Sequence, residues 1–216
     1  MIRPAMEYRH YISDRWLSGG RNVFAFNLQL QYVQSFGGRS VVPFFDRFFI
    51  GGENDIRGFD IRSISPIAVT LTRQFDFNGN PIIDPKTGLP QVLESAPFAI
   101  GGDSVGIFNF EYRIPIAGPL MMAGFYDIGI TRAMRKSSLG DFGASDVSII
   151  DGTNNRLRGS TGVEFQFTLP IVNAPFRLIV AYNPQRLSGG ITTPNGVTYS
   201  LNEPRRDIKF TVGRSF

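Results

Sequence analysis

The 216-residue sequence contains no cysteine, one histidine and one tryptophan. Without cysteine the chain has neither disulfides nor thiolate metal ligands, so the redox compartment is left undetermined. Hydrophobic residues are spread thinly, and no run approaches the roughly 18 apolar residues that a transmembrane helix needs. A helical membrane protein is therefore excluded.

Concentrated charge and catalytic constellations are also missing. The net charge is +4 with scattered basic residues, so we expect no nucleic-acid partner. Asp55, Asp60 and Asp103 do not have the spacing of a calcium loop, and we expect them to be solvated, with no metal or other cofactor. The single histidine, His10, has no evident serine or aspartate partner, so we do not expect an enzyme.

Phenylalanine and glycine are abundant, with 20 and 24 residues respectively. A chain rich in aromatic residues and glycine, with dispersed apolar residues, is typical of a membrane β-barrel, because only alternate residues of each strand meet lipid. Residues 1–13 carry charges throughout and have no apolar core, so we do not expect them to be a signal peptide.

Apolar and polar side chains alternate along seven segments. In residues 23–32 the even-numbered side chains from 24 onward are Phe, Phe, Leu, Leu and Tyr, whereas 27, 29 and 31 are Asn, Gln and Gln. This period of two predicts strands with one apolar face, which a soluble antiparallel sheet could also contain. The seven segments are residues 6–12, 23–32, 105–115, 121–131, 158–169, 176–182 and 207–216.

The connections between these segments alternate in length. Short connections cover 13–22, 116–120 and 170–175, and long ones cover 34–103, 132–157 and 183–206. Short turns at one end and long loops at the other are typical of outer-membrane barrels, and a soluble sandwich has no reason to sort its loops in this way. The sequence therefore predicts an all-β, antiparallel transmembrane β-barrel. Within the longest loop, residues 78–90 are rich in turn-forming pairs and are expected to be a flexible tip.

The longest loop contains the motif Phe-Phe-Ile-Gly-Gly-Glu-Asn-Asp-Ile-Arg-Gly-Phe over residues 48–59. Alternation places Glu111 and Asp127 on the polar, inward sides of adjacent strands, where two carboxylates should attract a cation. If the loop folds back into the lumen, Arg57 can bridge them and stack on Phe125. Both carboxylates could equally face water in the lumen. Their spacing does not distinguish this arrangement from binding of Arg57.

Taken together and in order, these pieces resemble the BamA-like family of outer-membrane assembly factors. The motif in 48–59 is similar to the signature of that family's long sixth loop. Residues 101–103 (Gly-Gly-Asp), residues 125–129 (Phe-Tyr-Asp-Ile-Gly) and the terminal Phe216 fit the same pattern.

The resemblance implies roles for individual residues. Arg57 would anchor the loop, with Ile56, Gly58 and Phe59 completing the anchor motif. The inward receptors of the arginine would be Glu111, Phe125 and Asp127. Gly51 and Gly52 would form the hinge of the loop, since glycine reaches backbone conformations closed to other residues.

The resemblance further implies an integral protein of the outer membrane of a Gram-negative-type bacterium that folds and inserts β-barrel proteins. Its partners would be unfolded outer-membrane proteins as clients, accessory assembly proteins and the lipid bilayer. A weakly paired last strand would form one half of a lateral gate, with Gly213 as a possible weak point. The gate residues would be Asp207, Ile208, Lys209, Phe210, Thr211, Val212, Gly213 and Phe216. A two-partner secretion pore and a passive porin are the alternatives.

The family resemblance implies a barrel of about sixteen strands, whereas the alternation predicts seven. An odd number of antiparallel strands cannot close into a barrel by itself in lipid. We therefore expect residues 1–216 to be the C-terminal part of a longer barrel, with a lumen-inserted loop at about 34–103 and without the family's periplasmic repeat domains. Assembly of several copies into one barrel is the less favoured alternative.

Overall fold

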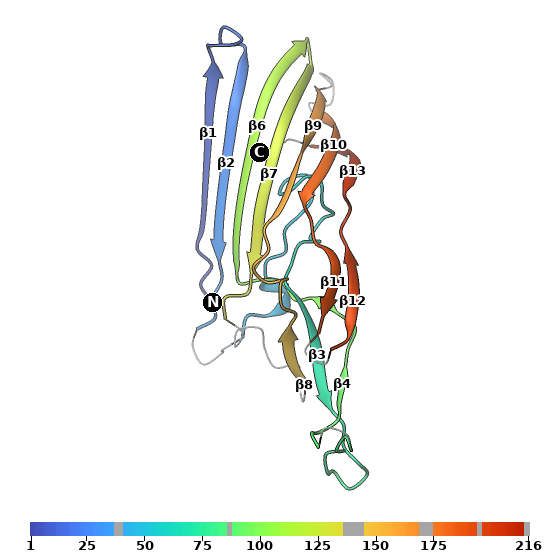
Figure 1. The fold of residues 1–216 in the computed structure, drawn as a ribbon. Coiled ribbons are helices and arrows are strands. Elements are labelled where there is room, and N and C mark those ends of the chain that lie inside the picture. The colour runs from blue at the N-terminus through green and yellow to red at the C-terminus, as the bar shows by residue number, and fades with distance from the viewer. Residues whose placement is uncertain (37–40, 86–87, 136–144, 169–174, 194–195, 214–216) are drawn as a thin grey trace.

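The computed structural model describes residues 1–36, 41–85, 88–135, 145–168, 175–193 and 196–213 (Figure 1). Its main element is a seven-stranded sheet in which neighbours in sequence order pair antiparallel. The strands are β1 (Ala5–Asp14), β2 (Asn22–Tyr32), β6 (Ser104–Ala117), β7 (Leu120–Arg132), β9 (Arg158–Thr168), β10 (Pro175–Gln185) and β13 (Arg206–Val212). All seven predicted segments are confirmed as strands, and β1 and β13 form the two edges of the sheet.

The connections are sorted by end, as predicted. The β1–β2 and β6–β7 turns lie at one end of the sheet, and the strands that flank the three long connections begin or end at the other (Figure 1). The third short connection, 170–175, falls almost wholly outside the described residues, as does Phe216.

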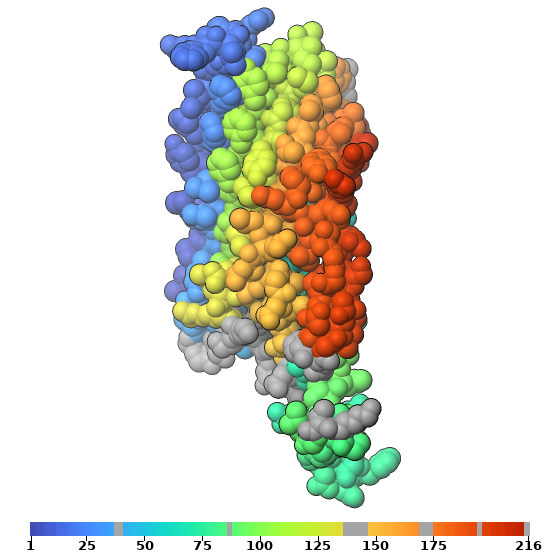
Figure 2. Space-filling view, in the orientation of Figure 1, coloured from blue at the N-terminus to red at the C-terminus, as the bar shows by residue number. Residues whose placement is uncertain are grey.

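The two faces of the sheet also follow the predicted alternation. On β9, Val163 and Phe165 are each 38% exposed, whereas Glu164 between them is fully buried. The apolar side chains thus form the outer face. The polar side chains lie on an inner face that other parts of the chain cover from β2 to β10, whereas Glu7 and Arg9 on β1 are each 46% exposed. Figure 2 shows the strands as a continuous surface, with the teal and green part of the longest connection, about residues 75–85 and 88–90, projecting beyond it.

The long connections contain structure that the alternation did not predict. β3 (Ile67–Arg73) pairs with β4 (Val92–Glu94) and β5 (Phe98–Ala99), and also with β8 (Ser145–Ile149) from the next long connection. β11 (Ser188–Thr192) and β12 (Thr198–Asn202) form a hairpin, and η1 (Phe44–Asp46) is a single 3₁₀ turn. Among the described residues, no helix is long and apolar enough to cross a membrane.

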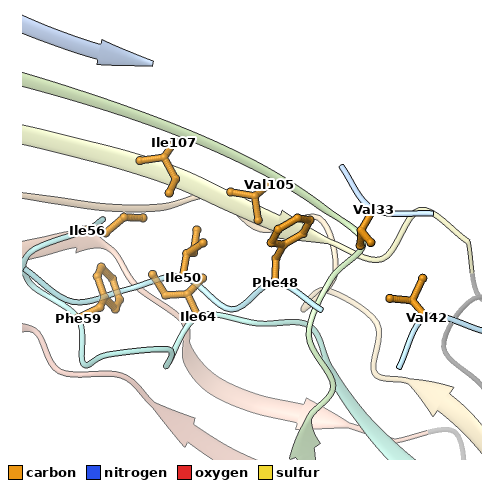
Figure 3. Close-up of a cluster of buried hydrophobic side chains, with 9 residues drawn as sticks. All are labelled: Val33, Val42, Phe48, Ile50, Ile56, Phe59, Ile64, Val105 and Ile107. Atoms are coloured by element: carbon orange, nitrogen blue, oxygen red, sulfur yellow. The ribbon is translucent and has the colours of Figure 1, made fainter. Parts of the chain in front are cut away.

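The longest connection returns to the inner face of the sheet. Residues 48–64 pack against β6 through the main hydrophobic cluster (Figure 3). Its members are Val33, Val42, Phe48, Ile50, Ile56, Phe59, Ile64, Val105 and Ile107. The predicted hinge residues Gly51 and Gly52 have φ values of +115° and +106°, a backbone region that residues other than glycine rarely adopt.

Close contact between this loop and β7 depends on Gly129. A Cβ atom there would lie 2.8 Å from Ile56 Cδ1 and 3.1 Å from Ile50 Cδ1, whereas one on Gly124 of the same strand would have no atom within 4 Å. We predict that Gly129→Val displaces the loop and lowers the free energy of unfolding by about 1–3 kcal/mol through overpacking. Denaturant unfolding measures the loss, with Gly124→Val as control. Equal stability of the two variants would contradict this packing.

Candidate functional site

The anchor motif forms a tight turn against the inner face of the sheet. Phe59 N–H donates to the Ile56 carbonyl at 3.1 Å, which closes the turn. Gly58 N–H donates to Ser160 Oγ at 3.2 Å. A Cβ on Gly58 would lie 1.8 Å from Asn183 Oδ1, so only glycine lets the turn approach β9 and β10 this closely.

Arg57 projects from this turn into a buried cluster of carboxylates and is 2% exposed. Its Nε and Nη2 donate to the two oxygens of Asp127 at 2.8 and 2.7 Å, in the bidentate geometry that guanidinium groups favour. Nη1 donates to Glu111 at 2.6 Å and to Glu164 at 3.1 Å. The guanidinium carbon lies 3.9 Å from the centre of the Phe125 ring. The structure thus brings Arg57 together with all three receptors expected from the sequence.

Burial by itself would lower the pKa of Arg57, since it penalises the charged form. The charge and hydrogen bonds of Asp127, together with the charges of Glu111 and Glu164, outweigh this effect and raise the pKa above its ordinary value. Arg57 is therefore a permanent cation. A lysine could not replace it equivalently, because an ammonium group lacks the planar donor pair that Asp127 binds.

Three members of the cluster, Glu164, Arg177 and Arg113, were not among the predicted site residues. Glu164 accepts from Arg177 Nε at 2.7 Å and from Arg177 Nη2 at 2.8 Å, so this carboxylate is shared between Arg57 and Arg177. Arg177 Nη2 also donates to the Glu53 carbonyl at 3.2 Å, which gives the loop a second contact with β10. Strand alternation already placed Glu164 and Arg177 inward, but their pairing depends on the β9–β10 register, which sequence does not show.

The cluster is balanced in charge. Three guanidinium groups (Arg57, Arg113 and Arg177) face three carboxylates (Glu111, Asp127 and Glu164). Arg113 Nε donates to the second oxygen of Glu111 at 2.6 Å. Buried charges are tolerated only when each is paired and hydrogen-bonded. Each of these six groups has an oppositely charged partner, and Arg177 Nη1 is the one cluster atom buried without a hydrogen bond to the described residues.

On β13, apolar and polar side chains of the predicted gate residues point to opposite faces. Ile208, Phe210 and Val212 are 70%, 68% and 54% exposed on the outer face. Inside, Lys209 contacts Asp207 at 3.1 Å and also binds the anchor turn. Thr211 is partly buried, and Gly213 N–H donates to the Pro175 carbonyl at 2.9 Å just beyond the strand. A gate role for these residues stays a prediction.

The expectation that the three loop aspartates are solvated is wrong for Asp103. This residue is 2% exposed and accepts backbone hydrogen bonds from Met134 at 2.8 Å and Arg135 at 3.0 Å. Asp60 is exposed, as expected. Asp55 is partly buried. Within the described ranges, no group of three or more histidine or acidic side chains is arranged to hold a metal ion.

Fold and site together define an all-β protein in which sequential antiparallel strands hold a long returning loop through a buried arginine. Residues 3–216 match the Omp85 superfamily domain, and the chain therefore belongs to the Omp85 superfamily. It is 27% identical over 180 residues to the outer membrane protein assembly factor BamA of Nitratidesulfovibrio vulgaris. That alignment covers 81% of this chain and 17% of the relative, so the chain spans a small part of that protein's length. The BamA-like resemblance is confirmed.

We predict that Arg57→Met releases the loop, because Asp127 would stay buried but lose the one guanidinium group that binds it among the residues the structure describes. Breaking one side of a buried ion pair costs about 3–5 kcal/mol. Limited proteolysis of residues 48–64 and heat-resistant compactness on gels measure the effect. Arg62→Met is the matched control, since Arg62 is an exposed loop arginine that stacks on Phe49. Unchanged protection in the Arg57 variant would contradict the anchor role.

Asp55 generates a prediction for pH. Burial, followed by repulsion from Glu53 and Asp127, raises the pKa of Asp55 to about 6, against a hydrogen bond from Gly51 N–H that lowers it. The docked loop then binds more protons than the released loop, so its stability falls as pH rises from about 4 to about 6. Asp55→Asn should remove this dependence and stabilise the docked loop by roughly 1–3 kcal/mol at neutral pH.

The measurement is denaturant unfolding of the wild-type protein and the Asp55→Asn variant across this pH range. Exposed Asp60 supplies the control Asp60→Asn, which should follow the wild-type profile. Parallel profiles for the Asp55 variant and the wild type would show that the Asp55 carboxyl is not perturbed by the docked loop.

Proposed function

We propose that this chain forms part of an integral outer-membrane β-barrel that folds and inserts other β-barrel proteins. The observation that carries the proposal is the anchor turn, whose arginine is buried among inward carboxylates of three strands. The similarity to a protein described as an outer membrane protein assembly factor supports the same activity.

Placement in a bilayer is supported by the outer face of the sheet. Six of the seven strands are 10 to 14 residues long, enough for a tilted strand to cross the hydrocarbon core. Their outer side chains are mainly aromatic and aliphatic, and their polar side chains lie mainly on the inner face. In this arrangement the outer face meets lipid, and residues of the 34–103 loop occupy the lumen.

The last strand supplies a surface for incoming chains. β13 pairs with β10 along one edge, and within the described residues its other edge is unpaired. An open edge presents backbone donors and acceptors that template an extended segment by β-augmentation. Unfolded outer-membrane proteins are the clients that this surface fits, and accessory assembly proteins would deliver them.

The proposal is tested by reconstituting the membrane-embedded protein in liposomes and adding a urea-unfolded β-barrel protein. We expect client folding to be faster than in protein-free liposomes and to slow in the Arg57→Met variant but not in Arg62→Met. The band shift of the folded client on unheated gels measures the rate. No acceleration by the wild-type protein, with ion conductance or export of a soluble polypeptide instead, would overturn the insertase assignment in favour of a porin or a secretion pore.

A further inference from the structure

The inner face of the last strand carries a cation that touches the anchor turn. Lys209 on β13 is largely buried, with 17% of its side chain exposed, and its Nζ donates to the Phe59 carbonyl. The same ammonium group lies 3.1 Å from Asp207 on its own strand and 3.7 Å from Asp60 in the loop. A charged donor from the sheet edge is therefore bound to the backbone of the turn that presents Arg57.

The Gly58 carbonyl, which precedes the Phe59 carbonyl in the turn, also accepts a hydrogen bond from a side chain of the sheet. Asn183 Nδ2 on β10 donates to the Gly58 carbonyl at 2.5 Å and to the Pro204 carbonyl at 2.8 Å. Pro204 lies two residues before the first residue of β13. Asn183 N–H also donates to the Arg205 carbonyl at 2.9 Å. Consecutive carbonyls of the turn are thus bound by side chains that belong to the last strand or hold its beginning in place.

These contacts carry weight because β13 has few others. It is the shortest strand of the main sheet, with seven residues, and it pairs only with β10 within the described part of the chain. Its outer side chains are more than half exposed at Ile208, Phe210 and Val212. Apart from the β10 ladder, the anchor turn is therefore a principal support of this strand.

We propose that Lys209 is a positioning residue that couples docking of the anchor turn to the pairing of the last strand. With the turn docked, its carbonyls bind Lys209 and Asn183 and hold β13 in register on β10. With the turn released, Lys209 keeps only Asp207, and β13 depends on its backbone ladder. These contacts support the coupling itself. The interpretation that the coupling controls a gate rests on the proposed function.

The test is hydrogen–deuterium exchange of the protein in detergent micelles, measured in β13, in residues 48–64 and in β2. Lys209→Met should speed exchange in both β13 and the turn by roughly tenfold, the effect of losing one charge-assisted hydrogen bond. Arg57→Met, which changes no contact of β13, should speed exchange in β13 as well, because coupling between two sites is reciprocal. Exchange in β2 should not change in either variant.

Two further variants separate coupling from general loss of structure. Lys209→Arg retains a cationic donor and should restore slow exchange, and Thr211→Val changes the inner face of the same strand without removing a contact to the turn. Faster exchange in β13 alone after Lys209→Met, or unaltered β13 exchange after Arg57→Met, would overturn the proposal. Reciprocal exchange without any acceleration of client folding would support the coupling while contradicting the insertase function.

Discussion

A buried guanidinium group must meet all of its partners at once, and this requirement governs how the loop lies on the sheet. Arg57 is withdrawn from water, which costs several kcal/mol unless paired carboxylates and hydrogen bonds compensate. The compensation comes from three strands, because Glu111 lies on β6, Asp127 on β7 and Glu164 on β9. A partly docked loop would leave charges buried and unpaired, so intermediate positions are disfavoured and docking approaches an all-or-none event.

Glycines set the distance at which this ion cluster can form. Gly58 lets the turn touch Asn183, and Gly162 leaves space on β9, where a Cβ would lie 3.0 Å from the Phe125 ring. The ring in turn lies under the Arg57 guanidinium. A Cβ on Gly162 would also lie 2.0 Å from the Val180 carbonyl oxygen on β10. Because side chains at these glycines would displace the turn, the β10 backbone or the ring, the electrostatic fit of Arg57 depends on backbone positions that carry no charge.

Strand alternation was sufficient to predict the seven-stranded sheet, its two faces and the inward direction of Glu111 and Asp127. It was not sufficient for the Glu164–Arg177 pair, which forms diagonally across a strand pair where Ile179 lies opposite Glu164. Strand alternation also did not predict β3 and β8, two short strands that lie in different connections and pair with each other. Asp103 was misread for the same reason, since its partners are backbone amides some thirty residues further along the chain. What sequence alone missed depends on register and on contacts between separate loops.

The contacts of the loop are not spread evenly over the sheet. Polar groups of residues 53–60 bind Asn109 and Glu111 on β6, Asp127 on β7, Ser160 and Glu164 on β9, Arg177 and Asn183 on β10, and Lys209 on β13. These are the five consecutive strands that end at the C-terminal edge. Loss of the contacts between the loop and these strands therefore weakens strand pairing on this side of the sheet first. The edge with the shortest ladder is therefore the one whose pairing responds most to the position of the loop.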